Sequence, residues 1–117
     1  MFADRLEAIH GRLDDALAVS LVGSDGIAVE SFASVELDLD ALAAELLTQV
    51  RGMSDDHREL AVGPVRQFAV TTDRYTLMIG ALTEDYYLLL VLGAGCGVGR
   101  ARYELRRAGL DFEQDLV

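Results

Sequence analysis

The chain has 117 residues, of which 51% are hydrophobic, so length and composition favour a single folded domain spanning residues 1–117 and exclude intrinsic disorder. Twenty acidic residues oppose ten basic ones, and the net charge of −10 at pH 7 disfavours binding to nucleic acid and to anionic membranes. The basic residues are all arginines, which is typical of a GC-rich genome, so mechanisms that need a lysine are excluded.

The longest apolar run, Tyr86–Leu92, continues through glycines to Val98. It is too short for a membrane span, which needs about 20 residues. The N-terminus lacks a signal-peptide pattern, and the single cysteine, Cys96, excludes an internal disulfide framework. We therefore expect a cytoplasmic protein without membrane insertion.

The first third of the chain predicts a helix followed by a hairpin. A first helix that ends between Gly11 and Asp15 is predicted, because apolar residues recur at helical spacing. These residues are Phe2, Leu6, Ile9 and Leu13. The segment 16–23 is apolar apart from Ser20, which is typical of a central strand. Ser24-Asp25-Gly26 predicts a tight turn, after which 27–33 returns as an edge strand because it carries Glu30.

A long helix is expected from Leu39 to Met53, with Asp38 or Asp40 as its N-cap. Its apolar stripe consists of Leu42, Ala43, Leu46, Leu47, Val50 and Met53. The opposite face carries small side chains beside Glu45, namely Ala41, Ala44, Thr48 and Gly52. That face favours the close approach of a second helix, although alanine is also simply a good helix former. We expect the helix to end or bend at Gly52, with a further short turn over 54–60.

Three strands and a last helix are expected after Gly63-Pro64. The strands are 65–71, which is polar and edge-like, then 75–83, then the apolar and central 86–92. The third strand can pair with a copy of itself or remain a solvated edge. The helix from Val98 carries Arg100, Arg102, Arg106 and Arg107, and a short acidic tail follows from Gly109. The arginines are interpreted as complementing the negative end of this helix, with an acidic partner as the alternative.

The order of elements predicts an α+β fold, αββαβββα, with one five-stranded antiparallel sheet and helices on both faces. The first, fifth and fourth strands are expected at the centre, and the second and third at the edges.

No candidate catalytic, cofactor or metal site stands out. The loop 93–99 lies between a strand and a helix, but the sixth position of the dinucleotide motif is Val98 or Arg100 instead of glycine. Cys96 lacks a nearby base, because the only histidines, His10 and His57, are expected on distant helix surfaces. Adjacent ligands such as Asp55, Asp56 and His57 do not converge on one metal. Tyr75, Tyr86 and Tyr87 are expected to pack the sheet. We therefore expect a protein that is not an enzyme.

The chain resembles the Roadblock/dynein light-chain superfamily and, within it, the bacterial MglB-like proteins. The resemblance rests on the opening helix, on 19–29 with its Ser24-Asp25-Gly26 turn, on the Leu/Ala-rich helix 39–53, and on the closing stretches 90–92 and 98–108. It implies a long helix on one face of the sheet and both terminal helices on the other. It also implies a homodimer that forms through the long helix and the third strand. Bacterial members of the family regulate a small Ras-like GTPase and supply no catalytic group.

We therefore expect a non-enzymatic homodimeric module that binds a Ras-like GTPase. The dimer interface is expected to comprise Ala41, Ala44, Leu47, Thr48, Arg51, Arg66, Phe68 and Val70. Partner contacts are expected at Glu45, Gln49 and Gly52. Two alternatives remain. One is a small-ligand sensor with a pocket near Tyr86 and Cys96, and the other is a scaffold adaptor that binds a peptide.

Overall fold

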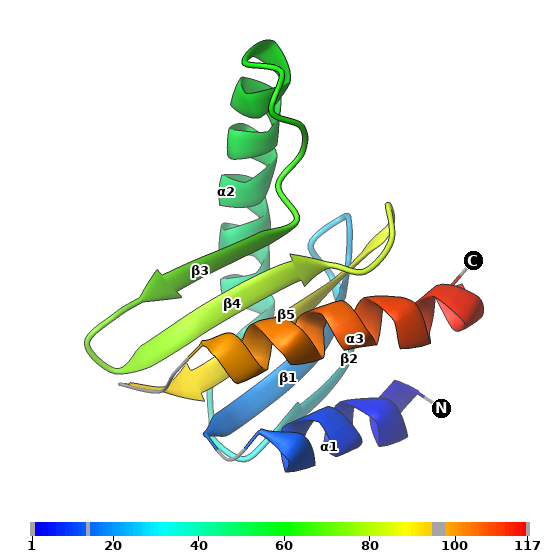
Figure 1. Ribbon diagram of the computed structural model, residues 1–117. Coiled ribbons are helices and arrows are strands. Elements are labelled where there is room, and N and C mark those ends of the chain that lie inside the picture. Colours follow the sequence, from blue (N-terminus) through cyan, green and yellow to red (C-terminus); the bar gives the residue numbers. More distant parts are fainter. Residues whose placement is uncertain (1, 14, 95–97, 117) are drawn as a thin grey trace.

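A computed structural model describes residues 2–13, 15–94 and 98–116. Three helices and five strands follow one another in the predicted order (Figure 1). They are α1 (Phe2–Arg12), β1 (Ala16–Gly23), β2 (Ala28–Ala33), α2 (Leu39–Glu59), β3 (Gln67–Thr71), β4 (Tyr75–Ala81), β5 (Tyr86–Gly93) and α3 (Gly99–Leu116). The α+β class and the order αββαβββα are confirmed.

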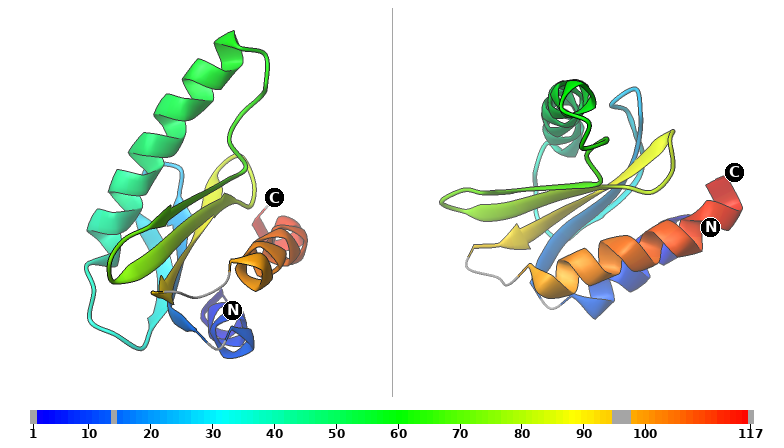
Figure 2. Two further views of the ribbon diagram at one scale, coloured as in Figure 1. Left: turned by 60° about the vertical axis from the view of Figure 1, so that its left-hand side comes forward. Right: turned by 45° about the horizontal axis from the view of Figure 1, so that its top comes forward.

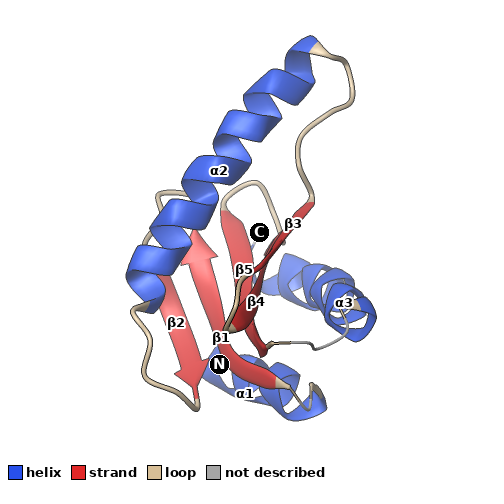
Figure 3. Ribbon diagram, turned by 90° about the vertical axis from the view of Figure 1, so that its left-hand side faces the viewer, coloured by secondary structure: helices blue, strands red, loops and turns tan. Residues whose placement is uncertain are grey.

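The strands form one antiparallel sheet in the order β2-β1-β5-β4-β3 (Figure 3). The strands that are apolar on both faces occupy its centre, where Val19 and Met78 both lie opposite Leu90. The two more polar strands, β2 and β3, are the edges. The predicted positions of all five strands are therefore confirmed.

The hairpin between β1 and β2 closes through the predicted Asp-Gly turn. Gly26 has a φ of +87°, a conformation that glycine adopts without strain. The amide of Ile27 donates to Oδ1 of Asp25 at 3.0 Å, and the amide of Gly23 donates to the carbonyl of Ile27 at 2.9 Å. Ile27 thus belongs to the turn, and β2 begins one residue later than predicted.

Helices cover both faces of the sheet (Figure 2), and each face has its own hydrophobic core. On one face, α1 and α3 cover the strands with Leu6, Ile9, Leu13, Leu105 and Phe112. On the other face, α2 contributes Ala43, Leu46, Leu47 and Val50. The alternation of side chains along β4 and β5 serves both cores, since Leu88 and Leu90 face α1 and α3 whereas Leu89 and Val91 face α2.

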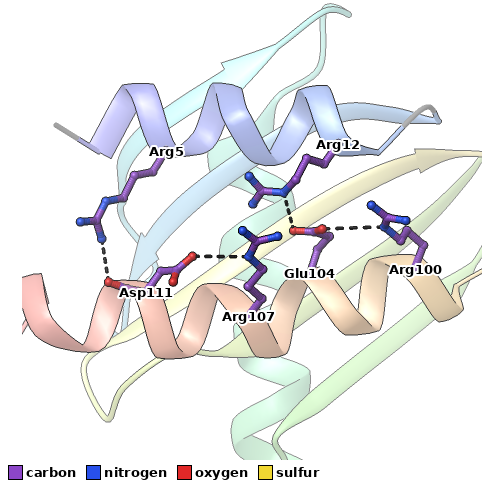
Figure 4. Close-up of polar contacts among 6 residues, drawn as sticks. All are labelled: Arg5, Arg12, Arg100, Glu104, Arg107 and Asp111. Atoms are coloured by element: carbon purple, nitrogen blue, oxygen red, sulfur yellow. Dashed lines mark hydrogen bonds and ion pairs between the residues drawn. The ribbon is translucent and has the colours of Figure 1, made fainter.

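A buried carboxylate ties α1 to α3 (Figure 4). The Glu104 side chain is completely buried, and Nε of Arg12 donates to its Oε2 at 3.0 Å. Nε of Arg100 lies 3.8 Å from the other carboxylate oxygen. Farther along, Arg5 of α1 donates to the carbonyl of Asp111 in α3 at 2.7 Å. These contacts fix the two terminal helices side by side.

Two strands are shorter than predicted, since β3 begins at Gln67 instead of residue 65 and β4 ends at Ala81 instead of residue 83. Both long helices run further than predicted. The helix α2 continues through Gly52 to Glu59, and α3 continues through Gly109 to Leu116, so the predicted acidic tail is helical. A glycine inside a helix costs about 1 kcal/mol, which the surrounding turns offset through buried residues such as Val50 and Phe112. The predicted N-cap is confirmed, because Oδ1 of Asp38 accepts from the amide of Ala41 at 3.1 Å.

Candidate functional site

The outer face of α2 is a strip of small and polar side chains open to solvent. These residues lie on the side of the helix opposite the buried apolar stripe, so they face away from the sheet. The exposed residues of this outer face are Ala41, Ala44, Glu45, Thr48, Gln49, Arg51 and Gly52. The Thr48 hydroxyl donates to the carbonyl of Ala44 at 2.9 Å, so this polar group is already satisfied within the helix. A second helix can therefore approach this face closely.

Leu47 departs from the predicted set. Only 1% of this residue is exposed, and it packs in the core between α2 and the sheet. It has no surface to offer to a second copy, because it lies on the sheet side of the helix. The outer face of α2 consequently lacks any large apolar residue from the predicted list.

The C-terminal half of α2 extends past the sheet (Figures 1 and 3). Its last fully buried residue is Val50, and the remaining nine residues to Glu59 add about 13 Å of helix. Beyond them, Leu60 and Val62 are 71% and 68% exposed. The amide of Val65 donates to the Ser54 hydroxyl at 3.1 Å and holds the returning segment beside the helix. This extension places two apolar side chains in water.

Leu60 and Val62 were missed by the sequence analysis, although the sequence carries a signal for them. The run Leu60-Ala61-Val62 is apolar and directly precedes the Gly63-Pro64 break, where no further helix turn can bury it. Ala61 and Gly63 have positive φ angles of 59° and 88°, so the chain turns back at this point. An apolar run inside such a turn is exposed unless another surface covers it.

The second part of the site is the free edge of β3. This strand pairs with β4 alone, and no other described strand lies beside it. Phe68 and Val70 point toward the α2 core and are half-buried, whereas Ala69 and Thr71 are exposed. Arg66 is exposed and precedes the first residue of the strand. The backbone groups along the outer side of β3 are available to pair with another strand.

The described residues hold no group of three or more histidine, cysteine, aspartate or glutamate side chains that could bind a metal ion. Residues 95–97 of the loop 93–99, which include Cys96, lie outside the described residues, as does the His57 side chain. Asp55 instead pairs with Arg58 at 3.5 Å, and His10 packs edge-on against Phe32 with ring centroids 4.8 Å apart. No helix in the described part of the chain is both long and apolar enough to cross a membrane.

The three tyrosines pack against the sheet cores as predicted. Tyr75 and Tyr87 contact the α2 core, and Tyr86 contacts the core under α1 and α3. Near Tyr86 there is a hollow of about 300 Å³ at the β1–β2 turn, lined by polar residues such as Asp25 and Asp85. It lies at the rim of the sheet, so it does not match the pocket expected between the sheet and the terminal helices.

Comparison with known proteins places this geometry in a family. No protein-family model matches the sequence, and neither does any curated protein. Among solved structures, MglC from Myxococcus xanthus is 32% identical, with a TM-score of 0.69 over 97% of this chain and 98% of that chain. This chain belongs to the Roadblock/LC7 superfamily. The Roadblock/LC7 domain from Streptomyces avermitilis is only 16% identical but has a TM-score of 0.87, with 97% and 96% of the two chains covered.

The Roadblock fold is also shared with MglB. An MglB structure described as having a tetrameric arrangement is 16% identical, with a TM-score of 0.85 over 95% of this chain and 84% of that chain. At this level of identity the likeness establishes the fold alone. The resemblance to MglB-like proteins in the sequence analysis is thus supported at the level of the fold.

Proposed function

We propose that this chain is a homodimeric regulatory module without catalytic activity, and that the dimer binds a small Ras-like GTPase. The observation that carries the proposal is the open outer face of α2 combined with the free edge of β3. One protomer leaves the small-residue face of α2 uncovered and the outer backbone groups of β3 unpaired. In the proposed dimer, a second copy covers the first and pairs with the second. Such self-complementary use of one patch by two copies is the commonest symmetry of protein dimers.

In the proposed dimer, two β3 strands pair antiparallel and join the sheets of both protomers. Main-chain hydrogen bonds along Gln67–Thr71 supply the pairing. The small side chains Ala41, Ala44 and Thr48 allow helix axes to approach to about 8 Å. The extended end of α2, with Leu60 and Val62, gains cover from the partner. A stable dimer of this kind buries at least about 1,200 Å².

The GTPase is proposed to dock on the paired α2 helices. Glu45, Gln49 and Gly52 are exposed there. Glu45 and Gly52 lie within the small-residue strip, and Gln49 lies at its edge, where it remains accessible when the helices pair. Family membership supports this assignment, because bacterial proteins that this chain resembles regulate such GTPases. The proposed role is to bind and order the GTPase, as the resemblance to the bacterial members of the family implies.

The dimer is tested by light scattering coupled to size exclusion. The wild-type chain should elute at twice its monomer mass of 12.7 kDa at micromolar concentration. Thr48→Arg should yield monomers, because a bulky charge enters the helix pair. Glu7→Arg on α1 is the matched control and should leave the dimer intact, since Glu7 is exposed on the opposite face of the sheet. A wild-type monomer would refute the proposal.

Partner binding is tested with a small Ras-like GTPase loaded with GDP or with a non-hydrolysable GTP analogue. We expect binding that depends on the nucleotide and is weakened by Gln49→Arg without loss of the dimer. An intact dimer that ignores the GTPase in both states would instead favour the scaffold adaptor.

A further inference from the structure

None of the four arginines of α3 lies in its C-terminal turn, where a positive charge would stabilise the helix, and Arg106 and Arg107 lie in its middle. Arg100 and Arg102 are in its first turn, and no basic residue is in its last turn. Cations at a helix N-terminus oppose the helix dipole instead of complementing it. The interpretation that these residues complement the negative end of the helix is therefore wrong, and their position requires another reason.

Ion pairs account for two of the four arginines. Arg100 pairs with Glu104, and Arg107 lies 3.9 Å from Asp111 (Figure 4). Arg102 and Arg106 are exposed and make no ion pair with any side chain that the structure describes. They are four residues apart on one edge of the helix, where two like charges repel each other. Neither contributes to the stability of the protomer in an evident way.

Arg106 and Arg66 converge on a groove between α3 and the ends of β3 and β4. This α3–β3 groove has a volume of about 600 Å³ and is lined by Arg66, Gln67, Ala81, Leu82, Arg106 and Leu110, with Gly109 at its wall. The side-chain amide of Gln67 donates to the carbonyl of Arg102 at 3.4 Å, which places Arg102 at the same rim. Arg66 and Arg106 thus bring positive charge from two parts of the chain to a groove in which none of the described lining residues is a carboxylate.

The groove also offers apolar surface. Leu110 is 71% exposed, and Tyr103 on the same outer side of α3 is 58% exposed. Exposed apolar side chains beside unpaired arginines are typical of a protein-binding surface. Because the chain as a whole carries a net charge of −10, this positive and apolar groove is a local reversal of its character.

We propose that the α3–β3 groove binds an acidic segment of a partner protein that also carries apolar side chains. The partner's carboxylates pair with Arg66 and Arg106, whose planar guanidinium groups match carboxylate geometry. Its apolar side chains cover Leu110 and Leu82. Nucleic acid fits poorly, because the overall negative charge repels an extended polyanion and the groove wall is apolar.

This surface is distinct from the proposed GTPase platform. It lies on the face of the sheet that carries α1 and α3, opposite α2 (Figure 2). The groove nevertheless adjoins the proposed dimer edge, because Arg66 and Gln67 line it and Gln67 is also the first residue of β3. The proposal goes beyond the proposed function and gives the chain a second binding surface. This surface would link an acidic protein to the partner that binds α2.

The test is a titration followed by ¹H–¹⁵N correlation spectra of the full chain. The probe is a synthetic peptide with two repeats of Glu-Leu-Glu-Glu-Leu-Leu. We expect a micromolar dissociation constant and shifted amide signals at Gln67, Leu82 and Leu110. The combined variant Arg66→Glu with Arg106→Glu should weaken binding more than about tenfold, since each exposed pair contributes up to about fivefold. Arg74→Glu is the matched control for a charge reversal, since this exposed arginine lies in the turn between β3 and β4, away from the groove lining.

Gly109→Gln provides a second variant that does not alter charge. Apart from the neighbouring residues and backbone of α3 itself, no described atom lies within 4 Å of the position of an added Cβ, so the substitution narrows the groove without disturbing the core. Gly109→Gln should weaken binding of the peptide while leaving the mass of the proposed dimer unchanged. A peptide in which glutamine replaces every glutamate should not bind. Raising the salt concentration should lower the affinity of the acidic peptide.

Three outcomes would overturn the proposal. The first is the absence of shifted signals at about 1 mM peptide. The second is an equal loss of affinity in the Arg74→Glu control, which would indicate general charge attraction. The third is that a single-stranded oligothymidylate binds the groove as tightly as the peptide. A monomeric wild-type chain would refute the proposed dimer but would leave this result unaffected.

Discussion

Removing Arg12 should destabilise the protomer more than removing any other arginine that makes a described ion pair. The substitution Arg12→Met keeps the apolar stem that packs between α1 and α3 but deletes the donor at 3.0 Å from Glu104. The Glu104 carboxylate is completely buried, so its remaining interaction is with Arg100 at 3.8 Å. A buried charge that loses its main partner is costly because it cannot recover hydration.

The expected magnitude follows from the exposure of the three side chains. Breaking a fully buried pair by removing one partner costs about 3–5 kcal/mol. Here the Arg12 side chain is 30% exposed and Arg100 remains nearby, so we expect a loss of about 2 kcal/mol in the free energy of unfolding. For a chain of this length that corresponds to a melting temperature lower by about 8 °C.

Urea denaturation at one fixed protein concentration measures the effect, because the proposed dimerisation would make stability depend on concentration. The matched control is Arg107→Met, whose pair with Asp111 is 3.9 Å long and about half exposed on both sides. It should cost about 0.5 kcal/mol or less. Arg12→Met combined with Glu104→Leu should recover most of the loss, since no buried charge remains. Equal effects of Arg12→Met and Arg107→Met would refute the reasoning.

Three further predictions concern local structure. Gly26→Ala should destabilise the fold by about 1 kcal/mol because Gly26 has a φ of +87°. Gly11→Ala lies in α1 and meets open space, so it should stabilise the fold by up to about 1 kcal/mol. Melting temperatures that shift in the same direction for both variants would contradict this. Asp38→Ala should cost about 1 kcal/mol by removing the N-cap of α2, and helicity measured by circular dichroism should fall, so unchanged urea midpoints would count against the cap. Leu90→Ala should cost about 3 kcal/mol in a fully buried position, while Ile27→Ala, at a residue 66% exposed, should change the unfolding free energy by less than about 0.5 kcal/mol.

Sheet order and layering were predictable because the pattern of apolar and charged residues in each strand indicates its place in the sheet. The apolar run of β5 fits only a strand buried on both faces, and Glu30 in β2 fits only an edge. The helix α2 was predictable for the same reason, since its apolar stripe repeats at helical spacing. These patterns are local, so they can be read from neighbouring residues.

Features that depend on distant residues were not predictable. The contact between Arg12 and Glu104 joins positions 92 residues apart and requires α1 and α3 to lie side by side. The continuation of α2 through Gly52 is a balance between a local cost and burial elsewhere. Leu47 was placed both in the apolar stripe of α2 and in the expected dimer interface, and its burial in the α2 core agrees with the stripe. The α3–β3 groove likewise exists only once β3 and α3 are adjacent.

The two borders of the sheet are built differently, and this difference sets a limit on assembly. On the β2 side, pairing with β1 loses register between Leu21 and Val22, and Glu30 extends a charge into solvent. Irregular pairing and exposed charge both discourage the addition of further strands. The β3 side pairs with β4 in unbroken register. Growth at one border only would stop after a single addition, so two copies would complete a finite ribbon that cannot lengthen into a fibre.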